Sequence, residues 1–262
     1  MKRFLTGIIA VSAWLLLLAM GPFLLFWLAI TLLAAVALAE YLAIVLPAED
    51  RRHKPLLVVF GLLPMIASCA GQPFMVLAGL IAALTALLLF AVLGHARLSA
   101  PYELISRSSF GYLAVSLCSA HLVLLMAMPQ GRAWLLLLTA VTAASDTAAF
   151  YTGSLFGRCK LCPAISPGKT WEGLVGGLVG GLLAALLVRI LFLPGESIPW
   201  IIGIALLLGC LGVVGDLAES IIKRAFAVKD SGTILPGHGG LLDRIDSLLL
   251  TAPVLYYLLS FP

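Results

Sequence analysis

The stretch PFLLFWLAITLLAAVALAEYLAIVL, residues 22–46, decides the fold class of this chain. A helix needs roughly 17–25 apolar residues to cross a bilayer, and Glu40 is the one charged side chain in this run. Similar apolar runs recur along the whole sequence, which predicts an all-α, polytopic integral membrane helix bundle. We expect about nine transmembrane helices, at 4–20, 22–46, 55–70, 73–93, 109–128, 133–156, 171–193, 198–215 and 247–260.

Composition supports the same class. The chain has 262 residues, 62% of them hydrophobic and 11% charged, whereas a soluble domain carries roughly 25% charged residues. We expect a single transmembrane domain over 1–262. Because the spans before about residue 140 hold few polar groups at membrane depth, we expect 1–140 mainly to embed the protein and 141–262 to form its catalytic part.

Lysine and arginine indicate the orientation in the membrane, since cytoplasmic loops are enriched in them. These residues gather in alternate segments, which predicts a cytoplasmic N-terminus. The inner segments are then 2–3, 51–54, 97–107, 158–169 and 223–244. The net charge of +4 therefore reflects topology and an anionic substrate at the inner face, not nucleic acid.

Four polar residues lie close together near the end of the eighth apolar run. Glu219, Ser220 and Lys223 follow Asp216 by three, four and seven residues, so a helix places all four on one face. This pattern predicts a polar helix face at the inner end of a span.

A second acidic pair, Asp243 and Asp246, has the same three-residue offset at the start of the last predicted helix. Mg²⁺ is bound in proteins by a few carboxylates together with substrate phosphate oxygens, and paired metal ions can hold both the attacking and the leaving oxygen of a phosphoryl transfer. We therefore predict Mg²⁺ as cofactor, bound by Asp216, Asp243 and Asp246 with Glu219 in support, and leave a second cation open.

The segment between the two acidic groups is rich in glycine. In Leu235-Pro-Gly-His-Gly-Gly240 the glycines let backbone amides approach an anion just ahead of a helix N-terminus. The candidate substrate contacts here are Ser220, Gly237, His238, Gly239 and Gly240. The candidate phosphate-binding cations are Lys223, Arg224, Lys229 and Arg244. On composition alone, a solvated topogenic loop would be the favoured interpretation of this segment.

The full spacing from Gly215-Asp216 through Asp246 resembles the signature of the phosphatidate cytidylyltransferases, or CDP-diacylglycerol synthases. Two upstream segments agree with this resemblance. Ser145-Asp146-Thr147 is similar to the family's Ser-Asp-Thr segment, and the stretch 166–173 is similar to its Ser-Pro-x-Lys-Thr-x-Glu-Gly segment. The similarity covers about 142–248, and Gly168 stands where many relatives carry a basic residue.

The resemblance implies a nucleotidyltransferase of phospholipid biosynthesis that joins CTP to phosphatidic acid and releases CDP-diacylglycerol and pyrophosphate. It implies an enzyme of the bacterial cytoplasmic (inner) membrane, with its active site facing the cytoplasm and membrane lipids around it. A homodimer is left open. The candidate catalytic residues are Asp146, Lys169, Lys223, Arg224, Lys229 and Arg244, and Ser166 and Thr170 join the candidate substrate contacts.

Several of these residues could instead have purely structural roles. Asp146 could make a buried helix–helix hydrogen bond, Glu172 could serve as a helix cap, and Glu40 could touch a lipid headgroup or simply reach water. At the level of the whole protein, a CTP-dependent lipid-alcohol kinase would use a similar site but transfer the γ-phosphoryl group. A non-enzymatic transporter with broken helices is the more distant alternative.

Overall fold

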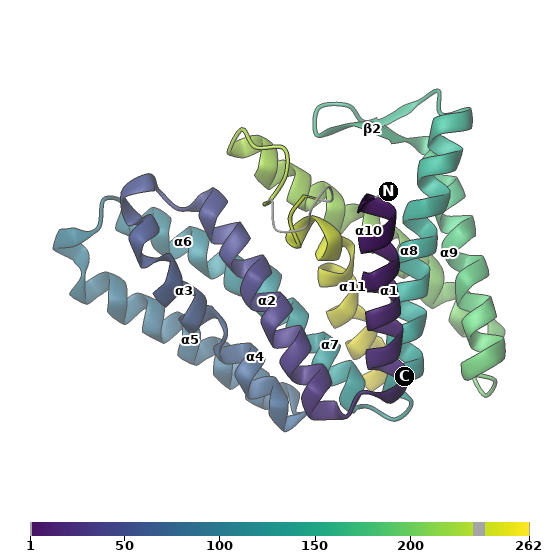
Figure 1. Ribbon diagram of the computed structural model, residues 1–262, viewed down its shortest axis with the longest axis horizontal. Coiled ribbons are helices and arrows are strands. Elements are labelled where there is room, and N and C mark those ends of the chain that lie inside the picture. The colour runs from purple at the N-terminus through teal and green to yellow at the C-terminus, as the bar shows by residue number, and fades with distance from the viewer. Residues whose placement is uncertain (1, 233–238, 262) are drawn as a thin grey trace. The chain divides into compact units, whose positions relative to one another are not determined.

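The computed structural model describes residues 2–232 and 239–261. The chain is helical almost throughout, with one two-stranded sheet (Figure 1). In chain order, the elements are α1 (Lys2–Met20), α2 (Phe23–Val45), η1 (Ala48–His53), α3 (Lys54–Gly61), α4 (Leu63–Ala67), η2 (Ser68–Ala70), α5 (Pro73–Leu93), η3 (His95–Arg97), α6 (Pro101–Gly111), η4 (Tyr112–Leu117), α7 (Cys118–Ala127), α8 (Gly131–Phe156), β1 (Lys160–Cys162), β2 (Ser166–Thr170), α9 (Trp171–Phe192), α10 (Ile198–Ala225) and α11 (Leu242–Ser260).

Over the described part of the chain, seven helical segments are long and apolar enough to cross a membrane. They are Phe23–Val45, Ala48–Ala70, Pro73–Leu93, Pro101–Ala127, Gly131–Phe156, Trp171–Phe192 and Ile198–Ala225. The predicted class, an all-α polytopic membrane protein, is confirmed. The two remaining predicted spans correspond to α1, whose apolar part is shorter, and to α11, whose first five residues include three charged ones. The count of nine therefore stays a prediction.

Three spans extend well beyond their predicted bounds: the run predicted at 109–128 begins at Pro101, and two others differ for identifiable reasons. The run predicted at 55–70 begins at Ala48 and is broken between α3 and α4, where Pro64 at the start of α4 cannot donate a backbone hydrogen bond. The run predicted at 198–215 continues as α10 to Ala225. The polar residues after 215 therefore lie on the same continuous helix as the span itself.

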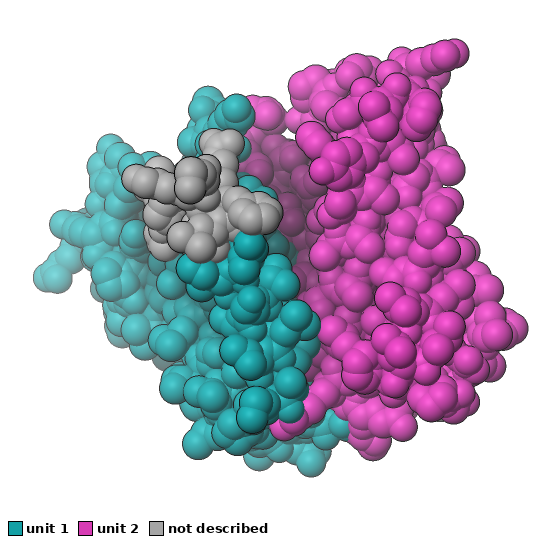
Figure 2. Space-filling view, turned by 45° about the vertical axis from the view of Figure 1, so that its right-hand side comes forward, with its two compact units in different colours: residues 1–128, 226–245 teal, residues 129–225, 246–262 magenta. Residues whose placement is uncertain are grey.

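The helices form two compact units, coloured separately in Figure 2. Unit 1 comprises residues 1–128 and 226–245, and unit 2 comprises residues 129–225 and 246–262. The boundary at 245/246 falls inside α11, so the first turn of this helix belongs to unit 1 and the rest to unit 2.

In unit 1, α2 packs against α3, α6 and α7 through buried aromatic and glycine contacts. The Tyr112 hydroxyl donates to the Leu57 carbonyl at 2.7 Å, and the Tyr41 hydroxyl donates to the Arg107 carbonyl at 3.0 Å. A Cβ at Gly111 would lie 2.6 Å from the Tyr41 ring, so the helices can approach this closely because a glycine is present.

In unit 2, α8 and α9 lie side by side along most of their length (Figure 1). Glycines of α9 face α8 at close range: a Cβ at Gly177 would lie 3.0 Å from the Ser145 carbonyl, and one at Gly180 would lie 3.0 Å from the Ala144 carbonyl. Small residues at such spacing let membrane helices pack through their backbones. The hairpin β1–β2, in which Lys160 pairs with Thr170, connects the two helices at one end.

Candidate functional site

Helix α10 confirms the predicted polar face. Ser220 Oγ donates to Asp216 Oδ1 at 3.4 Å, and Lys223 Nζ donates to Glu219 Oε2 at 3.1 Å, both across one helical turn. Glu219 is only 6% exposed, although it is a carboxylate. A charged group this deeply buried requires a close partner, and the ammonium group of Lys223 supplies one.

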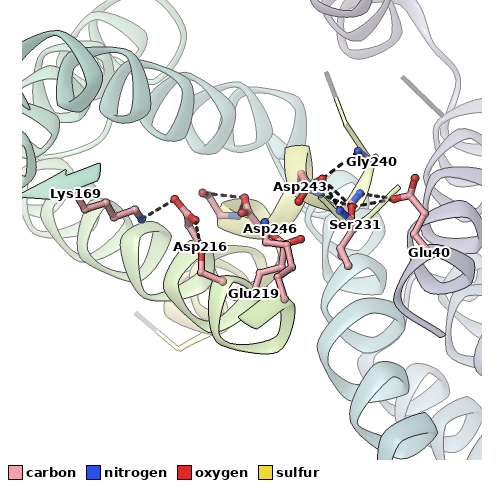
Figure 3. Close-up of polar contacts among 12 residues, drawn as sticks. Glu40, Lys169, Asp216, Glu219, Ser231, Gly240, Asp243 and Asp246 are labelled. Carbon is pink, nitrogen blue, oxygen red and sulfur yellow. Dashed lines mark hydrogen bonds and ion pairs between the residues drawn. The ribbon is translucent and has the colours of Figure 1, made fainter. Parts of the chain in front are cut away.

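The hairpin brings a second ammonium group to this face. Lys169 Nζ lies 2.5 Å from Asp216 Oδ2 (Figure 3). The residues that follow Lys169 are held by local hydrogen bonds: Thr170 Oγ1 caps α9 by accepting the Gly173 N–H, and the Glu172 carboxylate accepts the Cys159 N–H. Thr170 and Glu172 are thus helix-cap and hairpin residues in this structure, and Lys169 is the residue of the segment that faces Asp216.

The last carboxylate of unit 2, Asp246, lies one turn into α11. Its side chain makes a hydrogen bond with Glu219 and lies within electrostatic range of Asp216. Burial, with a contribution from the Asp216 charge, raises the pKa of Asp246 above its usual value. Gly215 allows this proximity, because a Cβ there would lie 2.8 Å from the Asp246 carbonyl oxygen. Negative charge is therefore concentrated at three neighbouring side chains of unit 2.

The carboxylate of Asp243, in unit 1, has different surroundings. Its Oδ2 accepts three hydrogen bonds, from Ser231 N–H at 2.9 Å, Ser231 Oγ–H at 2.9 Å and Gly240 N–H at 3.0 Å. Gly239 has φ +80°, a left-handed conformation that favours glycine. Asp243 therefore closes the loop that precedes α11, and its predicted role as a metal ligand stays a prediction.

The other predicted site residues are more dispersed. Arg224, Lys229 and Arg244 are exposed. Asp146 on α8 lines a small cavity of unit 2 together with Ser145, Gly209, Gly212 and Ser247. Ser166 lies in β2 and pairs with Cys162. Gly237 and His238 lie outside the described residues.

The carboxylates of unit 2 are candidate ligands for a divalent cation. Among the described residues, no three His, Cys, Asp or Glu side chains form a ready-made metal cluster. The donor chemistry nevertheless fits Mg²⁺, because Asp216, Glu219 and Asp246 offer hard oxygen atoms and Mg²⁺ commonly takes one or two carboxylates and completes its shell with water and substrate phosphate. Burial is the main reason why the pKa of Asp246 is raised, and the nearby Asp216 charge adds to it, so a divalent cation at these side chains would favour the ionised carboxylate.

Sequence reasoning missed two residues of unit 1. Glu40 on α2 is 6% exposed and accepts the Leu242 N–H at 2.9 Å (Figure 3). Ser231 contacts both Glu40 and Asp243. An ionisable residue inside an apolar run was a signal for Glu40, but no local pattern pairs it with a loop about two hundred residues away.

Comparison with known proteins supports the resemblance noted in the sequence. Uncharacterized protein YnbB of Escherichia coli K12 is 40% identical over 162 residues, which cover 60% of this chain and 54% of that protein. Phosphatidate cytidylyltransferases of Brucella suis biovar 1 and Staphylococcus saprophyticus are 42% identical over 130 residues and 36% identical over 167 residues. These matches cover 49% and 60% of this chain, and 47% and 64% of the respective relatives.

The matched regions therefore span about half to two thirds of the length of these relatives. The profile of the cytidylyltransferase family, by contrast, matches residues 1–261, nearly the whole chain. This polytopic membrane protein, in which Lys169 of the hairpin pairs with Asp216 of α10, belongs to the cytidylyltransferase family.

Proposed function

We propose that the protein is a phosphatidate cytidylyltransferase, which transfers the cytidylyl group of CTP to phosphatidic acid and releases pyrophosphate. One observation carries the proposal: in unit 2, three carboxylates, Asp216, Glu219 and Asp246, gather with the ammonium groups of Lys169 and Lys223. Such a mixed cluster suits a substrate that brings both phosphate groups and a cation. Family membership and the names of two relatives support the same reaction.

The two lysines are the phosphate ligands in this proposal. Each now donates to a carboxylate, Lys169 to Asp216 and Lys223 to Glu219. A phosphate oxygen is an equally good partner for a charged donor, so an ammonium group can pass from carboxylate to substrate without losing a hydrogen bond. The exposed Arg224, Lys229 and Arg244 add positive charge that attracts anionic substrates.

The reaction needs little proton chemistry from the protein. A phosphate oxygen of phosphatidic acid forms a bond to the α-phosphorus of CTP, and the bond from that phosphorus to the oxygen bridging to the β-phosphorus breaks. The electron pair leaves with pyrophosphate. Because a phosphate monoester has its second pKa at about 6, the nucleophile is already largely ionised at neutral pH. The side chains must therefore align two anions and reduce their repulsion.

Mg²⁺ is the proposed cofactor, and Asp216 and Asp246, with Glu219 in support, are its proposed ligands in unit 2. When bound, the ion would act as a Lewis acid toward the phosphate oxygens. The chain holds these three side chains close together, and the ammonium groups of Lys169 and Lys223 favour the ionised forms of Asp216 and Glu219.

We further propose that the protein lies in a bacterial cytoplasmic membrane with the β1–β2 hairpin on the cytoplasmic side. Gly168 is a suitable reporter position because it is exposed and has no atom within 4 Å of a built Cβ. In a background without the five native cysteines, Gly168→Cys should react with an impermeant thiol reagent only after the membrane has been opened. Labelling in intact cells would contradict this orientation.

Position-specific labels on CTP test the reaction. Purified protein in detergent receives phosphatidic acid, Mg²⁺ and CTP labelled at either the α- or the γ-phosphorus. A cytidylyltransferase moves the α-label into lipid and releases the γ-label as pyrophosphate. A CTP-dependent kinase would give the reverse pattern, and γ-label in lipid without α-label would reject the proposed function.

A further inference from the structure

Glu40 lies in unit 1 on α2, a helix that is long and apolar enough to span a membrane. Glu40 is 6% exposed, and its Oε2 accepts the Leu242 N–H at 2.9 Å and lies 3.3 Å from Ser231 Oγ. The other oxygen, Oε1, is buried and has no hydrogen-bond partner among the described residues. A membrane helix thus places a carboxylate directly against the loop that carries the family signature.

The loop is shaped to receive this carboxylate. A Cβ at Gly232 would overlap Glu40 Oε1 and lie 2.8 Å from its Cδ, and a Cβ at Gly240 would lie 2.7 Å from Glu40 Oε2. Both glycines therefore leave the space that the carboxylate occupies. The glycines of this segment serve close approach to Glu40 as well as backbone turns.

Ser231 connects Glu40 to Asp243. Its hydroxyl lies 2.9 Å from Asp243 Oδ2 and 3.3 Å from Glu40 Oε2, and its oxygen lies 3.3 Å from the Asp243 N–H. A serine hydroxyl has one proton, so that proton is shared between two carboxylates. Movement of Glu40 would therefore change the hydrogen bonds that orient Asp243 (Figure 3).

Stability alone does not account for a carboxylate at this position. A buried anion with an unsatisfied oxygen is costly, and replacement of buried charged groups by apolar ones of similar volume is often neutral or stabilising. The geometry points to a different role: we propose that Glu40 is a positioning residue, which holds Ser231 and the first turn of α11 so that Asp243 keeps the orientation required for turnover. The effect on turnover rests on the proposed function, whereas the effect on the loop does not.

Asp50 provides a matched control. It is also a buried carboxylate of unit 1, 1% exposed, and it too accepts one backbone N–H and one serine hydroxyl, both from Ser99, at 3.3 and 2.7 Å. Asp50 ties η1 to the segment before α6 and makes no described contact with the loop 231–240. Variants at Asp50 therefore report the general cost of losing such a carboxylate.

Hydrogen–deuterium exchange on the full-length protein in detergent, without substrates, tests the hold on the loop. Glu40→Ala should speed exchange at Ser231 and Leu242 by tenfold or more, whereas Asp50→Ala should affect Ser99 and leave 226–245 unchanged. Glu40→Gln should stay near the unaltered protein, because the amide oxygen can still accept both hydrogen bonds. Unchanged exchange in Glu40→Ala would overturn the inference.

Steady-state kinetics tests the consequence for catalysis. Glu40→Ala should lower kcat by up to about 100-fold, the scale of a misplacement of about 1 Å, while KM for CTP changes less than about threefold and Glu40→Gln restores most of the rate. An equal loss of kcat in Asp50→Ala would show general destabilisation and overturn the positioning role. Absence of turnover by the unaltered protein would instead reject the proposed function, and the exchange result would then stand by itself.

Discussion

The α10 carboxylates of unit 2, Asp216 and Glu219, are paired with ammonium groups, whereas Asp243 of unit 1 is held by backbone N–H groups and a hydroxyl. Asp216 and Glu219 face Lys169 and Lys223, and Asp243 faces Ser231 and Gly240. A lysine side chain is long and can exchange one anionic partner for another. A backbone amide is fixed by the fold and cannot follow a substrate.

This difference separates two roles that look identical in sequence. Asp243 and Asp246 are both aspartates of the first turns of α11, three residues apart. Asp246 lies within a group of carboxylates and cations, and Asp243 is tied to a loop by three hydrogen bonds at one oxygen. We therefore expect substitutions in unit 2 to act on chemistry, and substitutions in unit 1 to act on the geometry of the loop.

The largest effect is expected at Asp246. Asp246→Asn removes one anionic oxygen from the proposed Mg²⁺ ligands, and we expect turnover to fall by about 100- to 1000-fold, the scale seen when one electrostatic group is removed from an active site. The melting temperature should not fall, because burial raises the pKa of Asp246 and the substitution removes a charge that is disfavoured in this environment. CDP-diacylglycerol formation and thermal unfolding in detergent measure the two quantities.

The control for this variant is Glu49→Gln, a change at an exposed carboxylate of η1. It should leave turnover unchanged. Near-normal activity of Asp246→Asn at limiting Mg²⁺ would remove Asp246 from the metal site.

A smaller effect is expected at Lys169. Lys169→Met retains the aliphatic stem but loses the ammonium group 2.5 Å from Asp216, and we expect kcat/KM for CTP to fall by about 10- to 100-fold, equivalent to the loss of a charged hydrogen bond. Lys160→Met, on the other strand of the same hairpin, is the matched control and should stay within about twofold of the unaltered protein. Equal losses in both variants would mean that general hairpin charge matters and the contact with Asp216 does not.

Sequence reasoning succeeded where the signal is local. The length and apolar character of the runs predicted the membrane spans, and offsets of three, four and seven residues placed Asp216, Glu219, Ser220 and Lys223 on one helix face. Helix periodicity suffices for both because it depends on neighbours within a few turns. The start of α9 just after Thr170 followed from the same kind of pattern.

Sequence reasoning failed where contacts join distant segments. Nothing near Glu40 indicates that its carboxylate accepts a hydrogen bond from Leu242, and nothing in the segment 157–170 distinguishes a two-stranded hairpin from an irregular loop. The break at Pro64 was masked because the residues on both sides are equally apolar. Such features depend on tertiary packing, which a single sequence does not report.

A still smaller effect is expected at Gly240, within the loop of unit 1. The added Cβ of Gly240→Ala would overlap Ser231 Oγ and lie 2.6 Å from Gly232 N and 2.7 Å from Glu40 Oε2. Overpacking of this kind typically costs about 1–3 kcal/mol, so we expect roughly tenfold lower turnover together with a lower melting temperature. A loss of turnover without any loss of stability would place Gly240 in substrate binding. It would contradict the expectation that substitutions in unit 1 act only on the geometry of the loop.

The smallest effect is expected at Gly168, the hairpin position where the resemblance leads one to expect a basic residue. It is exposed, its φ lies outside the left-handed region, and a built Cβ has no atom within 4 Å. Gly168→Ala should therefore change stability by no more than about 0.5 kcal/mol and turnover by less than about twofold.

Gly168→Lys adds a cation one residue from Lys169, which contacts Asp216. If unit 2 acts through movable ammonium groups, this variant should lower KM for CTP by about twofold at low ionic strength and lose that advantage in high salt, because exposed charges are screened over about 10 Å at 0.1 M salt. Kinetics at two salt concentrations measures the difference. A gain that persists in high salt would contradict an electrostatic origin, and a raised KM would show that the hairpin does not approach the triphosphate as a cationic surface.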